Sequence, residues 1–255
     1  MNPKLKIFLN KIVNDKFLSK FGYRIITLKS LKVEESTPED NLLIEKCMKY
    51  SMTPMIRMWT LLNSINYVSR KNIKGDFVEC GVWRGGNLMM YNLLNKKKNL
   101  NRKIYGYDTF EGMPSPSKFD FKNNTSSPID IKNFYNQRTN SKNGWSKCTM
   151  DDVKKNIQKE SSLDNVNLIK GKVEDTLLIN DNIPEKISIL RLDTDFYEST
   201  KIELEVLFPR LEKNGILIID DYGYKWGAKK AVDEYFNKKP FLIYVDNDCR
   251  LLINN

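Results

Sequence analysis

The sequence predicts an α/β protein with a doubly wound, mostly parallel sheet. Short apolar runs alternate with helical patterns along most of the 255 residues, and this alternation is typical of parallel sheets covered by helices. The runs are rich in Ile and Leu without polar alternation, which indicates strands buried on both faces. Carboxylates directly follow two of the runs. Ligands bind at that edge of an open α/β sheet, so a functional site is expected there.

Seven segments are predicted as strands. Five alternate with helices and form the parallel part of the sheet: Asp76–Cys80, Lys103–Tyr107, Val166–Lys170, Ile187–Leu192 and Gly215–Ile219. Two more, Phe241–Val245 and Cys249–Ile253, surround Asp246-Asn247-Asp248. They are expected to form a closing hairpin that adds an antiparallel edge.

Helical spacing of apolar residues predicts helices over Thr200–Leu211 and Ala228–Asn237. A further helix begins at Thr53-Pro54, with Pro at the first helical position. Another is capped by Thr149. Near the N-terminus, Leu5–Phe17 is basic and amphipathic. It either lies on an acidic membrane surface or, the preferred interpretation, packs on its own domain or a second subunit, as in a homo-oligomer.

The length predicts one domain, residues 1–255, with residues 1–74 as an N-terminal helical extension. Residues 115–148 are predicted to be an insertion. Within it, Ser115–Trp145 is rich in Ser, Asn, Pro and Lys and shows no apolar periodicity. A long irregular segment inside a compact domain is usually a lid over a site or a disordered loop.

Composition restricts the function. No apolar run reaches the roughly 18 residues that span a membrane, and no signal peptide is evident, so a cytoplasmic protein is expected. Histidine is absent, which removes the usual general base and every Ser-His or Cys-His nucleophile. The four cysteines are scattered and form no CxxC motif. The net charge of +10 is spread along a chain rich in Lys, Asn and Ile, so nucleic-acid binding is not predicted.

Four carboxylates mark the first candidate site. Asp193 and Asp195 follow the strand Ile187–Leu192, and Asp220 and Asp221 follow Gly215–Ile219. Carboxylate oxygens that converge at one sheet edge suit a hard divalent cation such as Mg²⁺. The alternative is that these residues are ordinary helix caps. Paired carboxylates after two different strands favour the metal site.

The turn after the first strand is the second candidate site. Its glycines, in Gly81-Val-Trp-Arg-Gly-Gly86, permit a close approach of a ligand to the backbone. The spacing is not the GxGxxG of dinucleotide-binding proteins, which argues against a nicotinamide cofactor. Asp108 lies 27 residues after Gly81, at the end of the second strand, where an acidic side chain can bind ribose hydroxyls. Alternatively, Asp108 caps the turn before Gly112.

Four stretches together resemble the macrocin O-methyltransferase family: Gly75–Gly86, Asp108–Pro114, Leu190–Thr200 and Ile219–Gly223. The resemblance spans roughly Tyr50 to Phe236. It implies a class I methyltransferase that uses S-adenosylmethionine and Mg²⁺ to methylate a sugar hydroxyl. The fold of that class agrees with the strands predicted above.

The resemblance also assigns residues. It implies that the methionine part of the cofactor lies at Glu79, Gly81, Val82, Trp83 and Arg84, the ribose at Asp108, and the adenine near Thr109, Phe110, Val173, Glu174 and Asp175. It implies that Asp193, Asp220 and Asp221 bind the metal and that Asp195 is the general base, with Asp193 as the other candidate for that role. The saccharide acceptor stays open among nucleotide-linked, lipid-linked and antibiotic sugars. A catechol-type O-methyltransferase and a non-catalytic scaffold are the alternative functions.

Overall fold

The computed structural model describes residues 33–121, 127–140, 144–223, 226–237 and 240–255. The chain separates into two compact units, Met1–Asn41 and Leu42–Asn255, and each is considered by itself. In the described part of the first unit, Thr37 and Asp40 exchange hydrogen bonds at the start of helix α3 (Pro38–Met48). The predicted helix Leu5–Phe17 lies outside the described residues.

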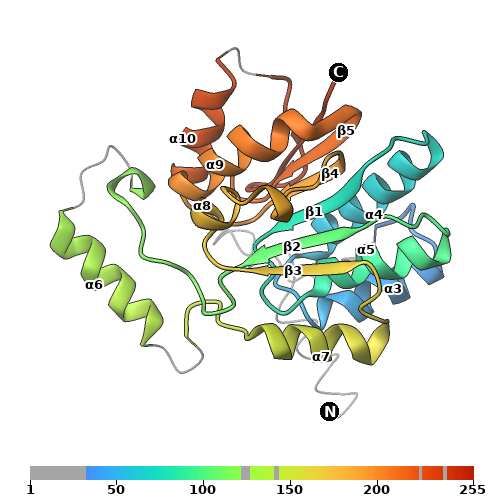
Figure 1. The fold of residues 1–255 in the computed structure, drawn as a ribbon, viewed down its shortest axis with the longest axis horizontal. Helices are drawn as coiled ribbons and strands as arrows, with labels where there is room; N and C mark the ends of the chain where they lie inside the picture. The colour runs from blue at the N-terminus through green and yellow to red at the C-terminus, as the bar shows by residue number, and fades with distance from the viewer. Residues whose placement is uncertain (1–32, 122–126, 141–143, 224–225, 238–239) are drawn as a thin grey trace, which may run out of the picture. The chain divides into compact units, whose positions relative to one another are not determined.

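The second unit contains a seven-stranded sheet in the order β3-β2-β1-β4-β5-β7-β6 (Figure 1). Its strands are β1 (Asp76–Cys80), β2 (Ile104–Asp108), β3 (Val166–Lys170), β4 (Ile187–Leu192), β5 (Leu211–Ile219), β6 (Ile243–Tyr244) and β7 (Arg250–Ile253). The first five are parallel, and β7 pairs antiparallel with both β5 and β6. The predicted doubly wound sheet with an antiparallel C-terminal hairpin is confirmed.

Strands β1, β3 and β4 have the predicted bounds, whereas others differ. Strand β2 is shifted by one residue and ends at Asp108, and β5 begins at Leu211 rather than Gly215. Strand β6 covers only Ile243–Tyr244 of the predicted Phe241–Val245, and β7 begins at Arg250. Strand β5 begins earlier than predicted because Leu211 pairs with Ile187 of β4. The residues that follow Leu211 include Lys and Asn, so the local sequence does not indicate a strand there.

Helices cover both faces of the sheet because successive strand residues point to opposite sides. One face of the strands, with Phe77, Ile189 and Ile218, packs with buried residues of α4 (Met55–Arg70), α5 (Gly86–Lys97) and α7 (Met150–Glu160). The other face, with Val78, Leu190 and Leu217, packs with α8 (Val173–Thr176), α9 (Tyr197–Leu207) and α10 (Trp226–Tyr235). This arrangement explains why the strand sequences lack polar alternation.

Two predicted helices have different limits. The helix predicted as Thr200–Leu211 is α9, Tyr197–Leu207, followed by the 3-10 turn Phe208–Arg210. Pro209 lacks an N–H and cannot continue an α-helix, so Leu211 is free to begin β5. Helix α10 begins at Trp226 and ends at Tyr235, two residues earlier at each end than predicted.

The predicted insertion, residues 115–148, contains more regular structure than its composition indicates. A 3-10 turn covers Lys118–Asp120, and helix α6 covers Pro128–Thr139. The prediction of an irregular segment is therefore wrong for these residues. Ser127 and Asp130 form a capping box and Pro128 occupies the first turn, so local signals start α6 without an amphipathic pattern. Its lid function stays a prediction.

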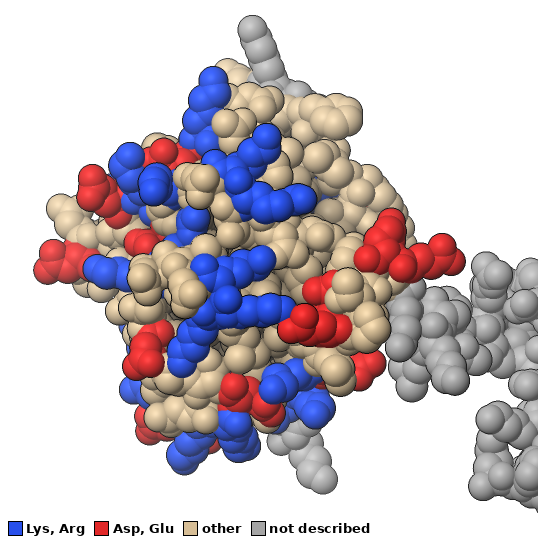
Figure 2. All heavy atoms as spheres, turned by 90° about the vertical axis from the view of Figure 1, so that its right-hand side faces the viewer, with Lys and Arg blue, Asp and Glu red and all other residues tan. Residues whose placement is uncertain are grey.

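Among the described residues, no helix is long and apolar enough to cross a membrane. Figure 2 shows one face of the molecule, on which Lys and Arg side chains form a broad band interrupted by Asp and Glu. The intermixing of both signs on this face agrees with a charge that is spread along the chain.

Candidate functional site

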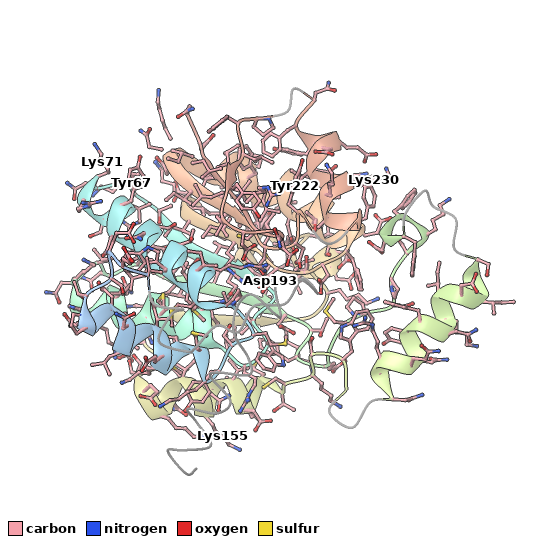
Figure 3. The ribbon with its side chains drawn as sticks, turned by 180° about the vertical axis from the view of Figure 1, so that it is seen from behind. Tyr67, Lys71, Lys155, Asp193, Tyr222 and Lys230 are labelled. Atoms are coloured by element: carbon pink, nitrogen blue, oxygen red, sulfur yellow. The ribbon has the colours of Figure 1, made fainter. Side chains whose placement is uncertain are left out.

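The acidic site forms where β4 and β5 end side by side. Leu192 pairs with Ile219 in the sheet, so Asp193 and Asp220 leave adjacent strands at the same level. The Asp220 backbone N–H donates to the Leu192 carbonyl at 2.9 Å, which extends this alignment past the strand ends. Carboxylate oxygens of Asp193, Asp220 and Asp221 all lie within 4.8 Å of one another. The structure thus brings together the three residues predicted to bind metal, and Figure 3 shows Asp193 between the helical layers.

A buried arginine holds two of these carboxylates. Arg191, the residue before Leu192 on β4, is 1% exposed. Its guanidinium donates to Asp193 Oδ2 at 2.8 Å, to Asp220 Oδ1 at 2.7 Å and to Glu79 Oε1 on β1 at 2.8 Å. Such charge-assisted hydrogen bonds are short and directional. Arg191 therefore fixes the side-chain orientation of Asp193 and Asp220.

A second arginine binds the other carboxylate oxygen of Asp220. Arg57 on α4 donates to Asp220 Oδ2 at 2.6 Å. The same guanidinium donates to Asp246 Oδ2 at 2.7 Å and to Asp248 Oδ2 at 2.8 Å in the turn between β6 and β7. Both oxygens of Asp220 thus accept from an arginine. The C-terminal hairpin is connected to the acidic site through Arg57.

The electrostatics of the site favour a bound cation. Burial, and then the neighbouring carboxylates Asp195, Asp193 and Asp220, raise the pKa of Asp221 well above its usual value. Burial is also the largest cause that raises the pKa of Asp193, against the opposing effect of Arg191. Carboxylates that share a site without enough positive charge retain protons, and a divalent cation removes that penalty.

The residues present fit such an ion. One oxygen of Asp221, Oδ2, is buried without a hydrogen-bond partner among the described residues, and a buried, unpaired carboxylate oxygen is costly. The three aspartates supply oxygen ligands only, which is the donor type that Mg²⁺ prefers.

Asp195 lies beside this cluster in a strained turn. Its φ of 66° is in the left-handed region, which is uncommon for a residue with a Cβ. Thr194 lies between Asp193 and Asp195 in the sequence, and its Oγ1 donates to the buried carboxyl of Glu203 on α9 at 3.0 Å. Burial raises the pKa of Glu203 well above its usual value. Glu203 therefore anchors Thr194, the residue before Asp195.

The glycine turn after β1 is braced by Asp108 from β2. Asp108 Oδ2 accepts from the backbone N–H groups of Val82 and Trp83 at 2.8 and 2.9 Å, and Oδ1 accepts from Phe110 N–H at 2.7 Å. Thr109 Oγ1 also lies 3.4 Å from Oδ1, but its one proton is donated to the Gly112 carbonyl at 2.6 Å. A carboxylate has about four acceptor positions, so capacity for a further hydrogen bond is left. Asp108 therefore caps the turn that begins at Phe110, one of the two expected functions, and it also lines the cavity described next. Its binding of ribose stays a prediction.

A cavity extends from the glycine turn to the acidic site. It is lined by predicted residues from four separate segments: Gly81, Trp83, Asp108, Thr109, Val173, Glu174, Asp193 and Asp195. Gly81, at φ +89°, packs so tightly that a Cβ there would overlap the Asp193 carbonyl oxygen. The predicted cofactor turn and the predicted metal site are therefore in direct contact.

Other predicted cofactor residues do not line this cavity. Glu79 is fully buried and binds Arg191 and Asn87, and burial raises its pKa to about 7. Val82 and Phe110 are buried, and their backbone N–H groups bind Asp108. Arg84 lines an adjoining hollow, and Asp175, on α8, is not among the lining residues of the main cavity.

Sequence reasoning missed the residues that support the acids. Arg191, Arg57 and Glu203 received no role, although each is held in the network described above. The available signal was Arg191 itself, the one charged residue within a buried strand. A charge at a position buried on both sides requires partners, and carboxylates were predicted two residues away.

The chain is similar to several known proteins. The family model described as Macrocin-O-methyltransferase (TylF) matches residues 24–249. The 8-demethyl-8-(2,3-dimethoxy-alpha-L-rhamnosyl)-tetracenomycin-C 4'-O-methyltransferase of Streptomyces olivaceus is 32% identical over 73% of this chain and 67% of its own length. The demethyldecarbamoylnovobiocin O-methyltransferase of Streptomyces niveus is 30% identical over 78% of this chain and 73% of its own length. The structure of the O-methyltransferase NovP matches with a TM-score of 0.69 and 28% identity, over 80% of this chain and 82% of that chain.

Proposed function

Because the chain belongs to the macrocin-O-methyltransferase family, and is therefore an O-methyltransferase with the class I S-adenosylmethionine-dependent fold, we propose that it methylates a sugar hydroxyl with the help of Mg²⁺. A relative named for a rhamnosyl-tetracenomycin 4'-O-methyltransferase supports a glycoside as acceptor. The proposed pathway is natural-product or surface-polysaccharide biosynthesis. The observation that carries the metal-assisted chemistry is the convergence of Asp193, Asp220 and Asp221 beside the cavity.

S-adenosylmethionine is proposed to occupy the cavity between the glycine turn and the acidic site. The lining includes Gly81 and Trp83 after β1, Asp108 at the end of β2, and Val173 and Glu174 after β3, and β2 lies between β1 and β3 in the sheet. The N-terminus of α5 follows the turn at Gly86, which favours a carboxylate such as that of the methionine part. Asp108 is proposed to accept a hydrogen bond from the ribose while it keeps the turn in place.

Asp193, Asp220 and Asp221 are proposed to hold Mg²⁺. When bound, the ion acidifies a hydroxyl group and fixes its direction, which a sugar hydroxyl needs because it is a poor nucleophile at neutral pH. Arg191 and Arg57 keep two of the three carboxylates in position through the hydrogen bonds given above. Asp195, next to the triad and in the cavity lining, is proposed to accept the hydroxyl proton.

The test is methyl transfer from labelled S-adenosylmethionine to glycosides, measured with Mg²⁺, with EDTA, and with Mg²⁺ restored. EDTA should abolish transfer and restored Mg²⁺ should recover it. Calorimetry should show binding of S-adenosylhomocysteine to the parent protein. Full activity in metal-free buffer would exclude the acidic triad from the mechanism, and binding of NADH in place of S-adenosylhomocysteine would refute the cofactor assignment.

A further inference from the structure

Asp195 lies at the centre of an uncommon backbone turn. The Phe196 backbone N–H donates to the Thr194 carbonyl at 2.7 Å, which closes a three-residue ring around Asp195. A hydrogen bond of this span with a φ of 66° at the central residue is the mark of a classic γ-turn, which is rare and strained, whereas the inverse form with negative φ is common. Such a conformation persists only where neighbouring contacts impose it. The contacts around the turn therefore determine whether Asp195 keeps this conformation.

The residue before Asp195 is held by a carboxyl group from another element. Thr194 Oγ1 lies 3.0 Å from Glu203 Oε1 and 3.2 Å from Oε2. Glu203 is buried on α9, and the thiol of Cys80, the last residue of β1, shares a second hydrogen bond with its carboxyl group. Glu203 thus contacts residues at the carboxyl ends of β1 and β4, which are neighbours in the sheet.

The residues on both sides of the turn are fixed as well. Before the turn, the Asp193 backbone N–H donates to the Cys80 carbonyl at 2.9 Å. After it, the Tyr197 backbone N–H, at the start of α9, donates to Asp120 Oδ1 at 2.7 Å. These contacts fix the ends of the segment, and the Thr194 hydroxyl adds a side-chain contact from within the turn. Glu203 therefore acts at the point where the backbone is strained.

A buried acid without a cationic partner is costly. Burial is the largest cause that raises the pKa of Glu203 well above its usual value, and neighbouring carboxylates raise it further, so the neutral acid is favoured. The hydrogen-bond partners that the described residues offer it, Thr194 and Cys80, are both uncharged. An apolar side chain would suit this position in the core better. The carboxyl group at this position is therefore better explained by its contact with the turn than by its packing.

From these contacts, and resting on the proposed function, we infer that Glu203 is a positioning residue for methyl transfer: through Thr194 it holds the strained turn that directs the Asp195 carboxylate into the cofactor cavity. Asp195 and Thr194 both line that cavity, whereas Glu203 is not among its lining residues. Glu203 therefore acts only through the turn. A reacting group displaced by about 1 Å can cost up to about 10²-fold in rate.

Two variants of Glu203 separate its hydrogen bond from its volume. Glu203→Met keeps the length of the side chain and removes both oxygens, whereas Glu203→Gln keeps an uncharged group whose carbonyl oxygen accepts from Thr194. In single-turnover methylation of p-nitrophenyl α-L-rhamnoside at saturating Mg²⁺, Glu203→Met should be slower by roughly tenfold or more. Glu203→Gln should stay within about threefold of the parent. A near-parent rate for Glu203→Met, or an equal loss in both variants, overturns the inference.

Stability and cofactor affinity distinguish positioning from a structural role. The calorimetric midpoint of Glu203→Met should stay within about 3 °C of the parent or rise, since an apolar side chain replaces a buried acid. S-adenosylhomocysteine affinity should stay within about threefold, because Glu203 does not line the cavity. Glu205→Met, at an exposed position of the same helix, is the matched control and should change neither rate nor midpoint. If the midpoint of Glu203→Met falls and its rate returns to that of the parent at lower temperature, the role is structural and the inference is wrong.

The partner residue gives an independent test. Thr194→Val keeps the branched shape and removes the hydroxyl, so it should slow the same step to a similar extent. The double variant with Glu203→Met should be no more than about twofold slower than either single variant, because both changes remove one hydrogen bond. A parent-like rate for Thr194→Val overturns the inference even if Glu203→Met fails to fold, and so does full additivity of the two losses.

Crystal structures separate this inference from the proposed function. The Asp195 φ should stay positive in the parent and in Glu203→Gln, and should become negative in Glu203→Met and in Thr194→Val. An unchanged turn in both of the latter variants overturns the inference. If the parent transfers no methyl group to any glycoside, the proposed function fails, and these structures still decide whether Glu203 holds the turn. If the parent is active and Glu203→Met is equally active, only the inference fails.

Discussion

Arg191→Met should be one of the most destabilising substitutions in this protein. Arg191 is 1% exposed and donates to Glu79, Asp193 and Asp220, and more weakly to Thr53 at 3.2 Å. Methionine fills much of the same volume but leaves Glu79, which is fully buried, without its cationic partner. Removing one partner of a buried ion pair typically costs about 3–5 kcal/mol.

The expected effect can be measured by calorimetric unfolding. For a chain of this length, each kcal/mol lowers the midpoint by about 2–4 °C, so the variant should melt roughly 6–20 °C below the parent. Saturating Mg²⁺ should recover part of the loss, because an ion at the proposed site would neutralise Asp193 and Asp220. It would not compensate Glu79, which binds Arg191 and Asn87. Adding Glu79→Gln to the variant should recover a further part.

The matched control is Arg210→Met, since Arg210 donates only to the Val206 carbonyl among the contacts described for it, at 2.8 Å. Its midpoint should change by less than about 3 °C. A loss below about 1 kcal/mol for Arg191→Met would refute the reasoning. It would mean that the buried carboxylates do not depend on Arg191 for their charge compensation.

Three further predictions concern the proposed catalytic parts. Asp193→Asn should weaken Mg²⁺ affinity in a titration. Asp195→Asn should keep metal and cofactor binding but slow single-turnover methylation by roughly 10²-fold or more. Near-normal turnover of Asp195→Asn would show that the two residues do not have these separate roles. Asp108→Ala should lower S-adenosylhomocysteine affinity by roughly tenfold or more in calorimetry, because three backbone N–H groups lose their acceptor; unchanged affinity would contradict the assignment. Gly81→Ala should lower both Mg²⁺ and cofactor affinity, since its Cβ displaces the Asp193 backbone, and a loss confined to one ligand would show that the two sites are independent.

The strands were predictable because burial on both faces leaves a direct trace in the sequence. Ile187–Leu192 lies at the centre of the sheet, and its bounds were predicted without error. Leu211 belongs to β5 only through its pairing with Ile187, and such a non-local contact has no local signal. Helix α6 was missed for a different reason. Ser127 and Asp130 form a local start signal, but the helix has no apolar stripe, which was the pattern used to predict helices.

The convergence of the three aspartates was predictable, whereas the residues that support them were not. Adjacent parallel strands must deliver Asp193 and Asp220 to the same edge, so spacing after the apolar runs was sufficient. Arg57 lies in a helix predicted only by its Pro-led start, and its partner Asp246 is 189 positions away. Nothing local distinguishes it from the solvent-exposed basic residues of this Lys-rich chain. Only the folded arrangement reveals that it supports the acidic site.

The contacts of Arg57 also have a consequence for synthesis on the ribosome. Arg57 is translated early, whereas Asp220 and Asp246 follow 163 and 189 positions later. At ordinary translation rates, Arg57 waits roughly 10–40 s before Asp246 has been made. During that time α4 can form, but the Arg57 guanidinium lacks its carboxylate partners, because the C-terminal hairpin has not yet been made. The acidic centre is therefore among the last parts of the nascent protein to be completed. Until the last strands pair, one edge of the sheet is exposed, and chaperones that cover this edge would matter most in that interval.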